Sequence, residues 1–266
     1  MSHRSMLTIA AALMLGFASL GQAQGNGPGY GSGSGSGSGQ GAAGCQGALI
    51  ERFELLVPEE LSDDELAAVL FLREEEKLAR DVYITLSLDY SLPIFTNIAR
   101  SENRHMGLVG LLIDRYDLPD PVQDDTVGVF TNPEIAALYA SLVAEGRHSL
   151  VDALTVGATI EDMDLADLYD MIATCDNLDI ALVAQNLAKG SRNHLRAFVT
   201  SLGASSGSYE AQYLDADVMA AILASDPERG VVYDEYGDVL AECGGPRGRI
   251  GRRGNHPAQG QNLLEQ

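Results

Sequence analysis

Two short segments of this sequence repeat each other and carry side chains that could bind a metal ion. Residues 98–106 and 187–195 match apolar with apolar, Ala with Ala, basic with basic and His with His. Glu102 and His105 are three residues apart, so on a helix they project from one face and can hold one cation together. In the second segment His194 takes the place of His105, but Ser191 takes the place of Glu102.

Glu76 and Glu161 are the other candidate ligands, because they are expected at the same depth as the repeated segments. At a rise of about 1.5 Å per residue, Glu76 and Glu102 lie about 18 Å and 12 Å from the turn between their helices. Glu161 and Ser191 lie about 20 Å and 21 Å from the turn between theirs. Two helical hairpins would therefore bring these polar residues together.

The sequence predicts an all-α fold. Helical spacing of apolar residues, with N-caps at Ser62 and Ser149, and Pro93 and Pro133 as helix starts or breaks, indicates five helices. They are expected at about residues 62–88, 94–116, 133–145, 149–174 and 177–203. Short turns make two antiparallel hairpins, and the long stretch between them is one crossover. The segment after Gly207 is expected to form a small C-terminal cap, without strands of useful length.

Burial is what separates a ligand from an ordinary acidic residue. Glu74 and Glu75 are expected to face solvent, whereas Glu76 shares a stripe with Leu72 and Tyr83 that should face the core. Burying several carboxylates together without a cation is costly, since like charges repel and desolvation opposes ionisation. The pattern favours a metal site over a metal-free, hydrogen-bonded polar core, which stays the alternative.

The composition divides the chain into a folded middle and two flanking segments. Residues 1–23 have the basic start, apolar stretch and small-residue exit of a cleavable signal peptide, which predicts a secreted or periplasmic protein. Residues 24–44 are predicted to be a flexible Gly/Ser-rich linker, 45–243 one domain with its core at 62–203, and 244–266 a disordered basic tail. No apolar run long enough to span a membrane is expected after signal cleavage. The net charge of −21 opposes nucleic-acid binding and favours cations.

Three cysteines suit an oxidising compartment but leave one thiol without a partner in the chain. Cys45 and Cys243 bracket the predicted domain, so we expect them to form a disulfide that joins its two ends. Cys175 is then expected to be free.

The helix motifs resemble those of rubrerythrin and other ferritin-like proteins, which use Glu-x-x-Ala-x-x-x-Tyr followed by Ile-Ala-x-x-Glu-x-x-His. Residues 76–83 and 98–105 fit this pattern. The chain is more closely similar to the domain of unknown function 2202 family, which is placed in the ferritin-like superfamily. Its hallmarks match residues 73–83, 128–134 and 190–198, and the resemblance covers roughly residues 62–224.

The resemblance implies a ferritin-like four-helix bundle with one long crossover and a metal site. Carried over residue by residue, its ligands are Glu76, Glu102, His105, Glu161 and His194. Ser191 departs from the pattern, because di-iron proteins place a bridging Glu there. Asp164, one turn beyond Glu161, is a candidate for the missing carboxylate, and Tyr83 is a candidate hydrogen-bond partner of the ligands. We therefore expect one tightly bound iron or manganese ion and a second, weaker one.

Two functional hypotheses from different classes follow. The first is an exported ferritin-like protein that binds iron or manganese and reacts with oxygen or peroxide; as an enzyme it would be an oxidoreductase of the di-iron carboxylate type. The second is a non-enzymatic envelope interaction or metal-storage module with a vestigial site. The predicted partner is a divalent metal ion, nucleic acid is not expected, and the sequence leaves a protein partner and a homodimer open.

Overall fold

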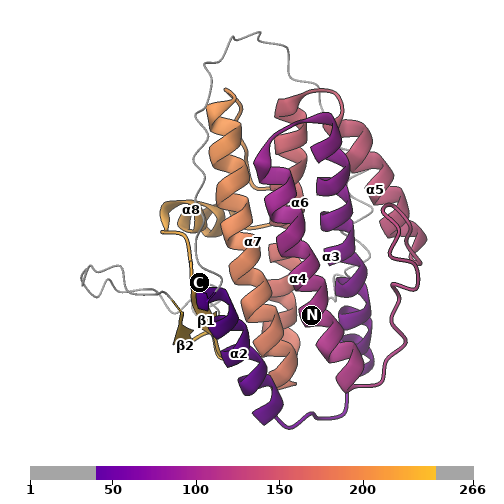
Figure 1. Ribbon diagram of the computed structural model, residues 1–266, viewed down its shortest axis with the longest axis vertical. Coiled ribbons are helices and arrows are strands. Elements are labelled where there is room, and N and C mark those ends of the chain that lie inside the picture. The colour runs from indigo at the N-terminus through magenta and orange to yellow at the C-terminus, as the bar shows by residue number, and fades with distance from the viewer. Residues whose placement is uncertain (1–39, 244–266) are drawn as a thin grey trace.

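The computed structural model describes residues 40–243, with side chains from Gly44 onward, and this part of the chain is predominantly helical (Figure 1). The predicted signal peptide, most of the predicted linker and the predicted tail lie outside the described residues. The helices are α2 (Gln40–Leu55), α3 (Asp63–Asp89), α4 (Pro93–Arg115), α5 (Pro133–Gly146), α6 (Leu150–Thr174), α7 (Leu178–Ala204) and α8 (Ala216–Ala224). The strands are β1 (Val231–Tyr233) and β2 (Val239–Glu242). The predicted all-α class is confirmed.

Helix starts follow the local chemistry that the sequence predicts. Ser62 and Glu65 form a capping box at the start of α3, in which each side chain bonds the other residue's backbone N–H. The Ser149 side chain accepts a hydrogen bond from the Asp152 N–H at the start of α6. Proline occupies the first turn of α4 and of α5, where its missing N–H costs no hydrogen bond.

The four long helices α3, α4, α6 and α7 pack side by side and enclose the apolar core (Figure 1). Short turns pair α3 with α4 and α6 with α7, and these two hairpins also contact each other through α4–α7 and α3–α6. Residues 116–149 cross over from α4 to α6. They include α5, which packs against α3 and α6. Helix α3 is therefore covered on the side that faces away from α4 and α7.

The prediction that Glu74 and Glu75 face solvent is wrong, because the crossover covers Glu74 and helix α6 covers Glu75. Only 3% of Glu74 and 2% of Glu75 is exposed. The Glu74 carboxylate accepts hydrogen bonds from the backbone N–H groups of Thr131 and Asn132, immediately before α5. Sequence periodicity identifies the face of α3 that packs in its hairpin, but it does not show that a long connection covers the opposite face.

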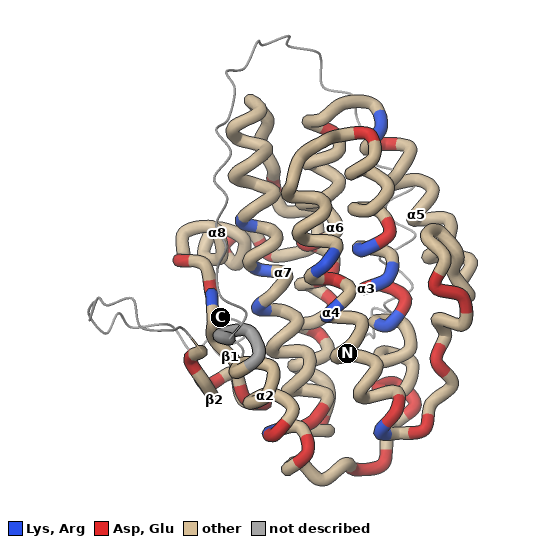
Figure 2. Tube along the Cα trace, in the orientation of Figure 1, with Lys and Arg blue, Asp and Glu red and all other residues tan. Residues whose placement is uncertain are grey.

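Other charged residues of the α3 motif at residues 73–83 also hold the crossover in place. The buried Lys77 ammonium lies 2.5 Å from Asp81 and donates to the Thr126 carbonyl. Arg73 pairs with Asp120, and Arg80 pairs with Asp125. Figure 2 shows that Lys and Arg are few and gather near the middle of the molecule, whereas acidic residues are spread over the helices and the crossover. Most charged residues of this motif are thus structural.

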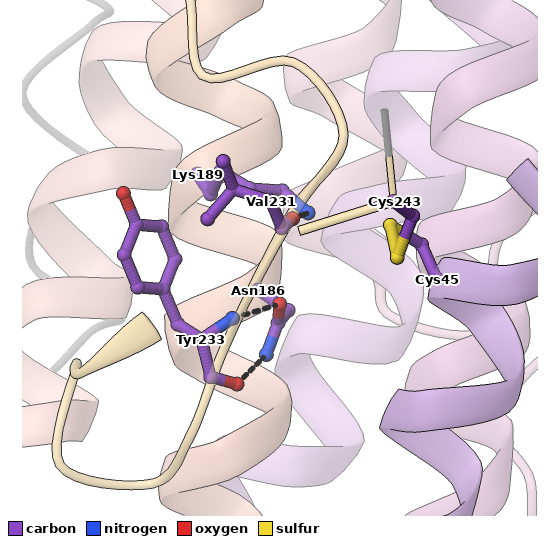
Figure 3. The surroundings of a disulfide bond; sticks show 6 residues. All are labelled: Cys45, Asn186, Lys189, Val231, Tyr233 and Cys243. Atoms are coloured by element: carbon purple, nitrogen blue, oxygen red, sulfur yellow. Dashed lines mark hydrogen bonds between the residues drawn. A yellow bond between two sulfur atoms is a disulfide. The ribbon is translucent and has the colours of Figure 1, made fainter. Parts of the chain in front are cut away.

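The C-terminal segment forms the predicted cap, but it contains a short antiparallel hairpin of β1 and β2 that the sequence pattern does not reveal. Asn186 of α7 bonds both the N–H and the carbonyl of Tyr233 (Figure 3). The Arg192 guanidinium pairs with Glu228 at 2.6 Å. These contacts attach the cap to the outer face of α7.

A disulfide joins Cys45 to Cys243, as predicted, with Cα atoms 5.4 Å apart (Figure 3). It connects α2 to the end of β2. Cys175 is free, also as predicted. Helix α2 itself was not predicted, and it begins at Gln40, inside the expected linker. Among the described residues, no helix combines the length and apolar composition needed to cross a lipid bilayer.

Candidate metal centre

The first half of the candidate centre comes from the α3–α4 hairpin. Glu102 and His105 lie one turn apart on α4, and Glu76 faces them from α3. His105 Nδ1 is 2.7 Å from Glu102 Oε2 and 3.3 Å from Glu76 Oε2. All three residues are buried, with at most 6% of each exposed.

The second half comes from the α6–α7 hairpin and meets the first at Glu102. His194 Nδ1 is 2.8 Å from Glu102 Oε1 and 3.4 Å from Glu161 Oε2. The rings of His105 and His194 are stacked, with centroids 5.4 Å apart. One carboxylate thus lies between two imidazoles. The structure brings together all five residues that the sequence selected, and we call them the inner centre.

Tyr83 supports the inner centre from α3. Its side chain is fully buried, and its hydroxyl donates a 2.6 Å hydrogen bond to Glu161 Oε1. Burial, together with the nearby charge of Glu161, raises the pKa of the Tyr83 phenol well above its usual value. The phenol therefore stays protonated and orients Glu161, which is the position the sequence analysis expects for it.

Ser191 and Asp164 lie beside each other where the repeat is broken. Ser191 is fully buried, and its hydroxyl donates to the Leu187 carbonyl of its own helix at 3.1 Å. Asp164 is 5% exposed and is close enough to Ser191 for its pKa to respond to that hydroxyl. Its Oδ1 atom has no hydrogen-bond partner. A carboxylate is therefore available next to the position that lacks one.

Gly190 explains how His105 fits between α4 and α7. A Cβ atom at position 190 would lie 2.3 Å from His105 Nε2 and 2.5 Å from Cε1, distances that real Cβ atoms essentially never show. The Nε2 edge of the ring thus packs against the α7 backbone, and the Nδ1 edge faces the carboxylates. Glycine at position 190 sets the orientation of this histidine.

The electrostatics of the inner centre are dominated by burial and by opposite charges in contact. Burial alone would lower the pKa of His105 and His194, but the carboxylates outweigh it and raise the pKa of His105 well above its usual value and that of His194 to about 10. Burial alone would raise the pKa of Glu102, but the two histidines outweigh it and lower it to about 2. Without a metal, both histidines are therefore expected to be in the positively charged imidazolium form at neutral pH.

The donor atoms fit a cation better than they fit one another. His105 Nδ1 and His194 Nδ1 lie at ion-pair distance from carboxylates, yet neither makes an aligned hydrogen bond. Glu76 Oε1 and Glu102 Oε1 are also buried without a hydrogen-bond partner. One ligand atom from each of Glu102, His105 and His194 lies within 4.8 Å of the others. Buried polar atoms are normally paired, so atoms that converge unpaired indicate space for an ion.

Two acidic residues near the inner centre were missed by the sequence analysis. Glu75 of α3 lies against Asp167 of α6, and burial, together with the charge of Asp167, raises the pKa of Glu75 well above its usual value. Only 4% of Asp167 is exposed. Asp167 is one helical turn beyond Asp164, which the sequence analysis names, and this continued spacing from Glu161 is the signal that could have pointed to Asp167.

Comparison with known proteins finds a relative, a solved structure and a family model that match this chain. The protein is similar to the uncharacterized protein MJ0754 of Methanocaldococcus jannaschii, with 48% identity over 183 residues, which cover 69% of this chain and 99% of the relative. The crystal structure of the hypothetical protein MJ0754 matches with a TM-score of 0.64 and 49% identity, over 65% of this chain and 99% of that chain. Residues 65–226 match the model of the uncharacterized protein domain DUF2202, so the chain belongs to this family.

Proposed function

We propose that this protein binds a divalent metal ion, iron or manganese, at the inner centre, and that its four long helices form a ferritin-like bundle. One observation carries the proposal. One ligand atom from each of Glu102, His105 and His194 converges from α4 and α7, and Glu76 of α3 contacts His105; four buried atoms of these residues, Glu76 Oε1, Glu102 Oε1 and both histidine Nδ1 atoms, lack a hydrogen-bond partner. In a metal-free protein, burying these polar atoms without hydrogen-bond partners would lower the stability of the fold.

The donor set supports iron or manganese. Three Glu carboxylates and two His nitrogens are ligands that suit these ions, and they carry no thiolate that would favour softer metals. The ferritin-like assignment is supported by the two hairpins joined by one crossover, and by the Glu-x-x-His spacing of Glu102 and His105. A bound iron ion would supply redox chemistry towards oxygen or peroxide.

The protein's own residues orient the ligands rather than react. Tyr83 holds one oxygen of Glu161 by its hydrogen bond and leaves the other free to face His194. Gly190 allows the Nε2 edge of the His105 ring to pack against α7 with Nδ1 turned inward. Such supporting contacts fix the geometry of metal ligands.

We propose one tightly bound ion per chain. Di-iron bundles use a Glu from each of two helices and a Glu-x-x-His pair from each of the other two. Here α7 has Ser191 in place of the second Glu of those pairs, and its hydroxyl is engaged by the Leu187 carbonyl. With one bridging carboxylate missing, a second ion beside the first would be poorly screened.

Export through a cleavable signal peptide stays part of the proposal. The Cys45–Cys243 disulfide supports it, since such bonds are typical of oxidising compartments. The N-terminal sequence of the mature protein, determined after expression with the native leader, tests it. A start near residue 24 is expected, and an intact Met1 would contradict export by this route.

The metal proposal is tested by elemental analysis of untagged protein after anaerobic loading with Fe²⁺ or Mn²⁺ and desalting. We expect about one retained ion per chain, and loss of that ion in Glu102→Ala and in His105→Ala. His148→Ala is the matched control, because His148 is exposed and lies before the start of α6, outside the inner centre. If the unaltered protein retains no ion under any loading condition, the polar core is structural and the interaction-module hypothesis replaces this one.

A further inference from the structure

A close contact between helices α6 and α7 lies one turn from the inner centre. A Cβ atom at position 157 would lie 2.3 Å from Phe198 Cε1 and 2.5 Å from Cδ1, so the Phe198 ring packs directly on the α6 backbone at Gly157. Only glycine leaves this space, because every other residue carries a Cβ atom. We call the space at Gly157 that receives the Phe198 ring the Gly157 notch.

The Phe198 ring in the notch packs against the ring of Tyr83. Their centroids are 5.1 Å apart, at a separation where aromatic rings attract each other. Phe95 packs on Phe198 in turn, with centroids 5.9 Å apart. All three side chains are fully buried. Phe198 is thus enclosed by the notch and two rings, and it restricts the positions that the Tyr83 ring can take.

The Tyr83 hydroxyl connects this packing to a candidate ligand. It lies 2.6 Å from Glu161 Oε1 and 3.3 Å from the Gly157 carbonyl oxygen, and it donates to both. Gly157 and Glu161 are one turn apart on α6. His194 and Phe198 are one turn apart on α7. The notch and the ligands therefore occupy adjacent turns of the same two helices.

We propose that Gly157 and Phe198 are positioning residues of the inner centre, which act through Tyr83 to hold Glu161 in place for metal binding. This inference rests on the proposed function, because it concerns the same site. Neither side chain offers a ligand atom, so any effect on metal affinity must pass through a neighbour, and both residues contact Tyr83. If the ring only fills the core, its loss lowers stability and leaves metal affinity unchanged.

A double-mutant cycle separates positioning from packing. Phe198→Leu removes the ring and Gly157→Ala fills the notch, and each is made alone and together with Tyr83→Phe. Phe53→Leu is the matched control, because Phe53 is a buried ring of α2 that packs against the Arg115 guanidinium and not against the inner centre. Circular dichroism and urea unfolding establish that each variant is folded. Each is then titrated with Mn²⁺ under nitrogen, and free Mn²⁺ is measured by electron paramagnetic resonance.

Phe198→Leu and Gly157→Ala should each weaken Mn²⁺ binding about tenfold or more, which is the effect of losing a contact that orients a ligand. Phe53→Leu should lower stability and bind Mn²⁺ normally. When Tyr83→Phe has already removed the hydrogen bond to Glu161, neither change should weaken binding by more than about a further twofold, because the two effects share one route.

The unloaded proteins give a second readout that does not depend on metal. The buried Tyr83 hydroxyl proton, held in a 2.6 Å hydrogen bond, should give a downfield proton resonance in nuclear magnetic resonance spectra. The resonance is assigned by its absence in Tyr83→Phe. It should persist in Phe53→Leu and be shifted or lost in Phe198→Leu and Gly157→Ala.

Two results would overturn the positioning role. Unchanged Mn²⁺ affinity in Phe198→Leu and Gly157→Ala would show that the rings only pack the core. An equal loss of affinity with and without the Tyr83 hydroxyl would show that they act on a different ligand. Failure of the proposed function gives a third pattern, in which the unaltered protein binds no Mn²⁺, and this inference then fails with it.

Discussion

Gly190→Ala should weaken metal binding at the inner centre, because the added methyl group would press against the Nε2 edge of the His105 ring, opposite the Nδ1 atom that faces the carboxylates. The new Cβ would lie 2.3 Å from His105 Nε2, whereas ordinary contacts begin at 3.4 Å. The ring or helix α7 must therefore move by about 1 Å to relieve the contact. Metal–ligand distances tolerate only about 0.2 Å, so His105 Nδ1 can no longer occupy its place among the ligands.

The energies predict a protein that stays folded but binds metal poorly. Overpacking costs roughly 1–3 kcal/mol, and replacing Gly by Ala inside a helix returns about 1 kcal/mol. We therefore expect a net destabilisation of at most about 2 kcal/mol. A displaced ligand should lower metal affinity at least about 10- to 100-fold, which is the effect of disturbing the contacts that orient a ligand.

Urea unfolding and Mn²⁺ titration of the same preparation separate the two effects. Gly107→Ala is the matched control, because Gly107 is an exposed residue of α4 with no atom within 4 Å of an added Cβ. It should gain up to about 1 kcal/mol and bind Mn²⁺ normally. Normal Mn²⁺ affinity in Gly190→Ala would refute the claim that His105 Nδ1 is a ligand whose position depends on this glycine.

Three further predictions concern the ligands and the helix cap. Metal binding at pH 7 should release protons, because the carboxylates raise the pKa of His105 and His194, and a histidine must lose the proton from its ligating nitrogen before it can bind a metal. Calorimetry in buffers of different ionisation enthalpy measures the number of protons released. No release would contradict ligation by the two histidines. Tyr83→Phe removes the hydrogen bond to Glu161 and should weaken Mn²⁺ binding about tenfold or more without unfolding the protein, whereas unchanged affinity would show that Glu161 is not a ligand. Burial would raise the pKa of Glu65, but hydrogen bonds from Ser62 and Asn177 outweigh it and lower the pKa to about 2. The contribution of the charged Glu65 to folding stability is therefore present above pH 4.5 and is lost as the pH falls towards 2. Glu65→Gln should therefore cost about 1 kcal/mol in urea unfolding at pH 7 and much less near pH 2, and an equal cost at both pH values would be inconsistent with a charged cap.

Most of the helical architecture could be predicted because its signals are local. Ser62, Ser149 and the two helix-starting prolines mark where helices begin, and the structure places helix starts within a residue or two of the expected positions. The inner centre could also be predicted, because one-turn spacing and equal depth in two hairpins are properties of sequence position alone. The disulfide followed from the position of Cys45 and Cys243 at the ends of the domain.

The features that sequence reasoning missed depend on contacts between distant segments. Glu74 and Glu75 are ordinary acidic residues in the sequence. Glu74 is buried because residues 116–149 fold over α3, and Glu75 is buried against α6. The proximity of Glu75 to Asp167 depends on how α3 and α6 are rotated about their axes. Helix α2 is joined to the end of β2 by the disulfide, and the β1–β2 hairpin is attached to α7 by Asn186. A two-stranded hairpin has little stability by itself, so these contacts hold it in place.

The most direct test of the central claim is anomalous X-ray diffraction from crystals loaded anaerobically with Mn²⁺, recorded above and below the manganese absorption edge. We expect a strong manganese peak among Glu102, His105 and His194, with both histidine Nδ1 atoms as ligands. Glu76 and Glu161 should complete its coordination from α3 and α6. Manganese found only at surface carboxylates in fully loaded crystals, with the His105 and His194 Nδ1 atoms still paired to Glu102, would contradict metal binding at the inner centre.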